Sequence, residues 1–179
     1  METYTVRVSK DYLVFCCAHF ITYEGDTCER LHGHNYRAMA EVEGPLDKNH
    51  YVFDFIALKN LMRRLTDELD HHVLLPTTSE LITIEANERQ VRVWFSPSPP
   101  TPLPASGERG RGEGDREWLF PREDCVLLPI ANTTAELLAR WIAERLTDAL
   151  VREKNFRPTR VKIEVEESFG QLATYELRQ

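Results

Sequence analysis

The stretch that most limits what this chain can become is residues 28–36, which read Cys-Glu-Arg-Leu-His-Gly-His-Asn-Tyr. His32 and His34 are two residues apart, so in an extended strand both imidazoles point to the same side. His19 lies just upstream, on a segment whose apolar residues alternate like those of a half-buried strand. Three neutral imidazoles and an open fourth position make up a typical catalytic zinc site. The pattern therefore predicts a zinc site formed by His19, His32 and His34.

Cys28 precedes His32 by four residues, and the sequence allows two roles for it. A nearby cation or a paired histidine would raise its thiolate fraction and make it a general base. Alternatively, Cys28 is a fourth ligand that closes the zinc site and makes it structural. The spacing does not separate these two roles, although the chain has no second Cys-x-x-Cys pair of the kind that structural zinc fingers use.

Two acidic positions away from this stretch are candidates for chemistry. Asp70 and His71 follow a predicted helix, so they either terminate it or form a carboxylate–imidazole pair for proton transfer. Glu167 comes two residues after Val165 on a predicted strand. If the strand continues, period two puts Glu167 on the buried face, where it needs a partner or a ligand with N–H donors. If the strand ends at Val165, Glu167 lies in a turn.

Residues 133–136, Thr-Thr-Ala-Glu, have the form of a capping box. We expect Thr133 to be the N-cap of a helix that runs to about Lys154, with Glu136 reaching back to it. A second helix is predicted after Asp54, which has the side chain of an N-cap and precedes an apolar stripe at three- and four-residue spacing.

The remaining pattern predicts strands and one insertion. Residues 4–20 are expected to form a long strand or a hairpin bent near 9–11. Further strands are expected at 35–43, 81–85, 91–95, 161–167 and 173–177. Residues 96–114 hold five of the ten prolines and four of the eight glycines, so we expect a flexible insertion there, flanked by segments that pair as a hairpin. The order predicts one α+β domain over residues 1–179, with two helices on one antiparallel sheet.

Composition sets outer limits on function. The chain has 179 residues and an ordinary balance of 42% hydrophobic and 28% charged residues. No run approaches the roughly 18 apolar residues that a membrane span needs. The cysteines show no disulfide framework, which predicts reduced thiols and a cytoplasmic protein. A net charge of −7 argues against nucleic acid as the main partner.

Taken together, the motifs resemble those of a known family. The matching residues are His19, Cys28-x3-His32-Gly-His34-Asn-Tyr, Val52-Phe53-Asp54-Phe55, Leu69-Asp70-His71, Asn132 to Glu136, Glu167-Ser168 and Tyr175. In this order they resemble the 6-pyruvoyltetrahydropterin synthase/6-carboxytetrahydropterin synthase family. The resemblance implies the tunnelling fold (T-fold), an antiparallel four-stranded sheet with two helices on one face. It also implies that subunits form an oligomeric barrel, as trimers or hexamers, with active sites at subunit interfaces.

The resemblance further implies roles for the candidate residues. Zinc would be bound by His19, His32 and His34, and the substrate would be 7,8-dihydroneopterin triphosphate. Cys28 would abstract a proton, and Asp70 with His71 would return protons. Glu167 would anchor the pterin ring, and the segment with Thr133, Thr134 and Glu136 would line the same pocket.

The gap of three residues between Cys28 and His32 is similar to that of bacterial 6-carboxytetrahydropterin synthases, which supply the deazapurine precursor of queuosine. This similarity implies a lyase that forms 6-carboxy-5,6,7,8-tetrahydropterin, acetaldehyde and triphosphate. Two alternatives stay open at this point: a 6-pyruvoyltetrahydropterin synthase acting on the same substrate, and a non-catalytic zinc-stabilised pterin-binding paralogue. Zinc is the only cofactor expected, and neither nucleic acid nor membrane is an expected partner.

Overall fold

The computed structural model describes residues 2–96 and 115–179. The predicted insertion at 96–114 therefore lies outside the described residues, apart from Ser96. The chain forms two compact units. The first, here called the helical unit, comprises Met1–Cys17, Gly33–His71 and Thr134–Gln179; the second, the hairpin unit, comprises Ala18–His32 and His72–Thr133. No helix in the described part of the chain is long and apolar enough to cross a membrane.

The strands that supply the helical unit are long, and they alternate between a buried and a charged face. They are β1 (Tyr4–His19), β4 (His32–Gly44), β10 (Arg160–Ser168) and β11 (Gln171–Arg178). The β4–β10 register pairs Ala38 with Val165 and Val42 with Val161, so buried residues oppose buried residues. In β1 the buried positions change from even to odd numbers between Val8 and Leu13, which places an irregularity where the sequence predicted a bend.

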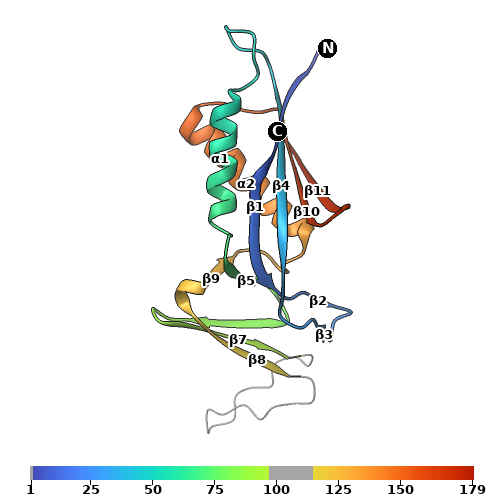
Figure 1. Cartoon of the computed structure of the whole chain (residues 1–179), viewed down its shortest axis with the longest axis vertical. Coiled ribbons are helices and arrows are strands. Elements are labelled where there is room, and N and C mark those ends of the chain that lie inside the picture. The colour runs from blue at the N-terminus through green and yellow to red at the C-terminus, as the bar shows by residue number, and fades with distance from the viewer. Residues whose placement is uncertain (1, 97–114) are drawn as a thin grey trace. The chain divides into compact units, whose positions relative to one another are not determined.

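Two helices cover the buried face. Helix α1 (Phe55–Asp67) starts at Asp54, whose carboxylate accepts a 2.7 Å hydrogen bond from the Ala57 amide, so the predicted N-cap is confirmed. Helix α2 (Ala135–Lys154) contacts α1, β10 and β11. Figure 1 shows the two helices side by side next to the strands of this unit. The expectation of an α+β fold with two helices is confirmed.

The expected four-stranded antiparallel sheet is corrected in two respects. The main sheet has six strands, in the order β11-β10-β4-β1-β5-β9. The two added strands, β5 (His72–Pro76) and β9 (Cys125–Leu128), pair in parallel. The sequence gives no local sign of this, because parallel pairing joins segments that are far apart in the chain.

The hairpin unit consists of short antiparallel pairs around a small core. Residues 21–31, which lie outside the strands predicted from the sequence, contain the hairpin β2 (Thr22–Tyr23) and β3 (Thr27–Cys28). A three-stranded sheet follows, with β6 (Ile82–Ala86), β7 (Gln90–Phe95) and β8 (Arg116–Pro121), then the short 3-10 helix η1 (Arg122–Asp124). The expected pairing of the segments on either side of the insertion is confirmed, since Phe95 pairs with Arg116.

Candidate functional site

The three histidines predicted to bind metal lie together. His19 ends β1, while His32 and His34 begin β4. Each offers one ring nitrogen, and these nitrogens lie within 4.8 Å of one another. Tetrahedral zinc holds its nitrogen ligands about 3.4 Å apart, so small side-chain adjustments would bring all three to one ion. His19 is buried, whereas His32 is exposed, so the cluster is open to solvent on one side.

Backbone carbonyl groups orient two of these rings. His19 Nδ1 lies 2.9 Å from the carbonyl oxygen of Thr133, and His32 Nδ1 lies 2.8 Å from that of Arg30. A carbonyl only accepts hydrogen bonds, so each Nδ1 carries the proton and each Nε2 carries the lone pair that a metal needs. Histidine ligands of metals commonly donate their other N–H in this way. The donor set therefore fits a metal ion.

Cys28 does not join the histidine group. Its side chain packs in the apolar core of the hairpin unit with Phe20, Leu75 and Val93. Burial raises the pKa of the Cys28 thiol to about 11, and the Arg116 guanidinium offsets only part of that rise. At neutral pH such a thiol is protonated, which makes it a poor base. Among the described residues the group of possible ligands is the three histidines alone, which disfavours a closed four-ligand site.

Glu29, the residue after Cys28, is a candidate functional residue that was not identified from the sequence. Its carboxylate lies 3.8 Å from His32 Nε2, and its side chain is 35% exposed, so a ligand at the histidine cluster would meet it. Adjacent residues of an extended segment point to opposite sides, so burying Cys28 turns Glu29 toward the histidine. The signal that would have found Glu29 was an acid three residues before the first histidine of His-Gly-His.

Glu167 lies where the buried-face prediction places it. Strand β10 continues to Ser168, with an irregularity between Glu166 and Ser168. The carboxylate of Glu167 accepts a 2.7 Å hydrogen bond from the hydroxyl of Tyr36 and lies 3.7 Å from His34 Nε2. Its side chain is 31% exposed, so this carboxylate is held in place yet remains accessible.

Asp70 and His71 form the predicted pair, but outside a helix. Helix α1 ends at Asp67, and His71 adopts a left-handed backbone conformation with φ of 59°. One carboxylate oxygen of Asp70 accepts a 2.7 Å hydrogen bond from the Cys16 amide, and the other lies 2.8 Å from His71 Nδ1. Desolvation would raise the pKa of Asp70, but these hydrogen bonds outweigh it and lower that pKa.

The segment before α2 differs from the capping box that the sequence suggested. Thr134, not Thr133, is the N-cap, and its hydroxyl accepts a hydrogen bond from the Leu137 amide. Thr133 is fully buried and donates its hydroxyl to the Phe20 carbonyl, while its own carbonyl orients His19. Glu136 is exposed in the first turn of α2. Thr133 therefore belongs to the support of the histidine cluster.

The family model for 6-pyruvoyl tetrahydropterin synthase matches residues 7–178. A protein of Methanocaldococcus jannaschii, provisionally named 6-carboxy-5,6,7,8-tetrahydropterin synthase, is 29% identical over 91% of this chain and 89% of its own. A dihydroneopterin monophosphate aldolase of Pyrococcus furiosus is 35% identical over 42% of this chain and 67% of its own.

Among solved structures, 6-pyruvoyl tetrahydropterin synthase from Plasmodium vivax superposes with a TM-score of 0.80. The two chains cover each other fully and are 28% identical. A second structure of the same Plasmodium enzyme carries alanine in place of a glutamate that is described as a catalytic residue.

Proposed function

The chain belongs to the 6-pyruvoyl tetrahydropterin synthase family, and from this premise we propose that it is a zinc-dependent lyase acting on 7,8-dihydroneopterin triphosphate. The proposed products are 6-carboxy-5,6,7,8-tetrahydropterin, acetaldehyde and triphosphate, which would place the enzyme in the synthesis of queuosine's deazapurine precursor. The choice of product is supported by the name of the Methanocaldococcus relative. The observation that carries the proposal is the oriented histidine cluster with two accessible carboxylates, Glu29 and Glu167, beside it.

His19, His32 and His34 would hold the metal through their ring nitrogens. When bound, zinc acidifies a substrate hydroxyl and stabilises negative charge on its oxygen. The carbonyls of Thr133 and Arg30 would keep two rings in the tautomer that binding requires. Loss of either support is expected to weaken metal affinity about 10- to 100-fold.

Glu167 is proposed to hold the pterin ring. The amino group and ring N–H of a pterin form a pair of donors that a carboxylate can accept together. The Tyr36 hydroxyl fixes the Glu167 carboxylate from the protein side, so the ring would meet an acceptor that is already oriented. Thr134 and Glu136, which were predicted to line the same pocket, are proposed only as peripheral contacts because one caps α2 and the other is exposed.

The base that removes a proton from the substrate side chain is proposed to be Glu29. Cys28, the base implied by the family resemblance, is buried in an apolar core, and the pKa of its thiol is raised to about 11. Glu29 is accessible beside His32, and carboxylates are common general bases. The catalytic glutamate of the Plasmodium enzyme supports this assignment by analogy. Asp70 and His71 are proposed to return protons, with Asp70 orienting the imidazole.

A second candidate function follows from Glu29. A carboxylate base that takes the proton of the second side-chain hydroxyl can start a retro-aldol cleavage. The bond between the first and second side-chain carbons breaks, the phosphorylated two-carbon aldehyde leaves, and a proton returned to the first carbon leaves a hydroxymethyl group on the pterin. The Pyrococcus furiosus aldolase relative supports this reaction class. Elimination of triphosphate to a pyruvoyl product, as the name of the Plasmodium enzyme states, uses the same residues.

The test is incubation of the zinc-loaded protein with 7,8-dihydroneopterin triphosphate, with products identified by mass spectrometry. A carboxytetrahydropterin with acetaldehyde supports the first proposal, whereas a hydroxymethyl or pyruvoyl product replaces it with the second candidate or with the elimination. Metal content measured in parallel should be about one zinc per subunit and should fall in a His32→Ala variant. Sedimentation of the same sample tests the proposed trimer or hexamer with active sites at subunit interfaces.

A further inference from the structure

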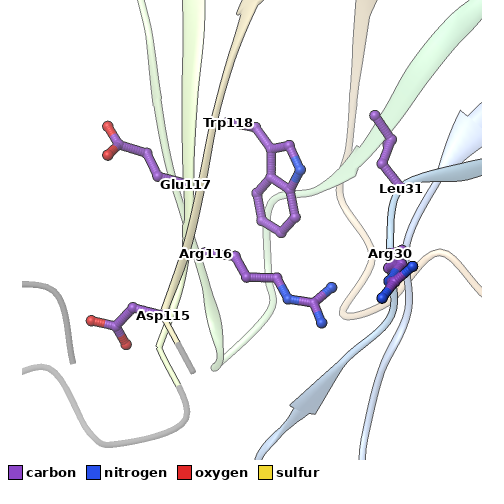
Figure 2. A pocket seen from close by; sticks show the side chains of 6 residues that line it. All are labelled: Arg30, Leu31, Asp115, Arg116, Glu117 and Trp118. Atoms are coloured by element: carbon purple, nitrogen blue, oxygen red, sulfur yellow. The ribbon is translucent and has the colours of Figure 1, made fainter. Parts of the chain in front are cut away.

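A pocket in the hairpin unit lies directly beside the segment that carries Glu29 and His32. It has a volume of about 330 Å³ and is lined by Arg30, Leu31, Asp115, Arg116, Glu117 and Trp118. Figure 2 shows Arg116 and Trp118 on one side of strand β8, directed toward Arg30 and Leu31. Asp115 and Glu117 point to the other side of the strand, as alternation along β8 requires.

The pocket therefore presents two guanidinium groups with its acids turned away. Asp115 accepts a 2.8 Å hydrogen bond from the Ser96 hydroxyl, and Glu117 lies 3.2 Å from Arg92. Within residues 2–96 and 115–179, neither Arg30 nor Arg116 forms an ion pair with a carboxylate. Two arginines that make no ion pair among the described residues therefore give this pocket a local positive charge, although the chain as a whole has a net charge of −7.

The walls of the pocket are held in place. Trp118 stacks on Phe20, with ring centroids 4.6 Å apart and an interplanar angle of 9°. Arg116 donates one N–H to the carbonyl oxygen of Glu29 at 2.7 Å, which fixes the direction of its guanidinium. A guanidinium has five N–H donors in a planar fork, so the other donors of Arg116 can bind phosphate oxygens.

Both arginines are tied to the backbone of the candidate site. The carbonyl of Arg30 orients His32, and the carbonyl that Arg116 binds belongs to Glu29. Arg30 is two residues from His32, and two residues of extended chain span at most about 7 Å between Cα atoms. The pocket therefore adjoins the chain segment that carries Glu29 and His32.

We propose that Arg30 and Arg116 form the subsite for the phosphate chain of the substrate, with Trp118 as its apolar wall. The proposal rests on the proposed function for the identity of the substrate. The binding chemistry, two guanidiniums that grip a polyphosphate, stands on the pocket itself. The subsite would orient the phosphate end of the substrate while its reacting carbons lie at the histidine cluster.

The test uses inorganic tripolyphosphate as the probe, added to the metal-loaded full chain and followed by calorimetry at low and high salt. Wild type is expected to bind it more tightly than monophosphate, and more weakly as the salt concentration rises. Arg30→Gln should weaken binding about ten-fold or more, because each hydrogen bond to a charged group contributes on that order. Arg116→Gln should do the same.

Arg89→Gln is the matched control, since Arg89 lies in the same unit beyond the opposite end of β7 and should leave tripolyphosphate affinity unchanged. The metal content of Arg30→Gln should equal that of wild type, which separates loss of the subsite from loss of metal. Quenching of tryptophan fluorescence by tripolyphosphate should disappear in Trp118→Phe. If the quenching persisted in that variant, tripolyphosphate would not bind beside Trp118, and the proposed location of the subsite would be wrong.

Measuring substrate turnover alongside tripolyphosphate binding tests the phosphate subsite and the proposed reaction independently. If Arg30→Gln raises KM for the triphosphate substrate and leaves kcat and product unchanged, both stand. Arginine-dependent binding of tripolyphosphate without turnover of any pterin supports the subsite and overturns the reaction. Turnover with equal tripolyphosphate affinity in wild type and Arg30→Gln overturns the subsite and leaves the reaction standing.

Discussion

Strand β4 begins at the histidine cluster and ends at a cluster of charges around Arg160. The two ends differ in how their charged side chains are paired. At the far end, Arg160 is bound by the carboxylates of Glu41, Glu43 and Glu176, and its side chain is only 12% exposed. These bonds and the nearby negative charges overcome desolvation and raise the pKa of Arg160. At the histidine end, Glu167 is 31% exposed and Glu29 is 35% exposed.

The difference separates stability from chemistry. The charges of the Arg160 cluster are bound to one another, so they tie β4, β10 and β11 together around the Arg160 side chain, which is only 12% exposed. At the histidine end, Tyr36, Thr133 and Arg30 hydrogen-bond to Glu167, His19 and His32. The side chains of Glu167 and His32 are 31% and 38% exposed. Substitutions should therefore affect unfolding free energy at one end and turnover at the other.

The largest effect is expected for Glu29→Gln, which removes the proposed base. We expect kcat to fall about 10²- to 10⁴-fold, the usual contribution of a general base, with zinc content unchanged. Cys28→Ala is the matched control, because it alters the adjacent residue on the opposite side of the segment. A large loss of kcat in Cys28→Ala, together with a near-normal kcat in Glu29→Gln, would show that the Cys28 thiol is the base.

The next effect concerns stability at the other end of β4. Arg160→Met leaves three carboxylates facing one another without their cation, and we expect about 3 kcal/mol lower free energy of unfolding in urea titration. Arg178→Met also removes a partner of Glu176, but Arg178 is 72% exposed and its loss should cost less than about 1 kcal/mol. If the Arg160→Met variant lost its metal at a temperature where it remains folded, the two ends of β4 would not have separate roles in stability and function.

Glu167→Gln is expected to raise KM for the pterin about ten- to a hundred-fold, because it weakens hydrogen bonds to a charged acceptor. Glu166→Gln is its control, since Glu166 is the neighbouring acid and lies near Arg37 on the other face of the strand. Steady-state kinetics with both variants would decide whether the anchor is the carboxylate beside Tyr36. Equal KM values in the two variants would remove Glu167 from the proposed site.

The smallest effect is a pH dependence at Asp70. Its pKa in the folded state is lowered by hydrogen bonds from Cys16 and His71, which outweigh desolvation. The stabilisation is thus complete above the unfolded pKa of about 4 and is lost as pH falls through the lower folded value. Asp70→Asn should therefore unfold more easily than wild type at pH 7, and the difference between the two should shrink as pH falls below about 4. Asp67→Asn, at an acid that is 65% exposed, is the control and should change the free energy of unfolding at pH 7 by less than about 0.5 kcal/mol.

Local patterns predicted the elements better than the long-range contacts. Helix α1 followed from the capping side chain of Asp54 and an apolar stripe, both of which act within a few residues. The N-cap of α2 was placed one residue early because Thr133 and Thr134 have the same capping chemistry. Only hydrogen bonds to Phe20 and His19, more than 100 residues away, show that Thr133 serves another purpose.

The candidate site was predicted in part for the same reason. His32 and His34 followed from period two along a strand, and the structure brings His19 to them. The burial of Cys28 could not be predicted from the sequence pattern, because it depends on an apolar core built largely from strands β6 and β7. The roles of Asp70, His71 and Glu167 remain predictions, although each side chain lies beside a partner that suits its role.

The hydrogen bond between Ser96 and Asp115 has a practical consequence for protein engineering. The β7–β8 ladder runs up to Phe95 and Arg116, and the next residue on each strand is joined to the other at 2.8 Å. Ser96 and Asp115, the described residues on either side of segment 97–114, are therefore joined to each other. An affinity tag or a fluorescent domain inserted between Ser96 and Asp115 should be tolerated, and it would attach a reporter beside Asp115, which lines the pocket of Arg30 and Arg116, without altering the chain termini.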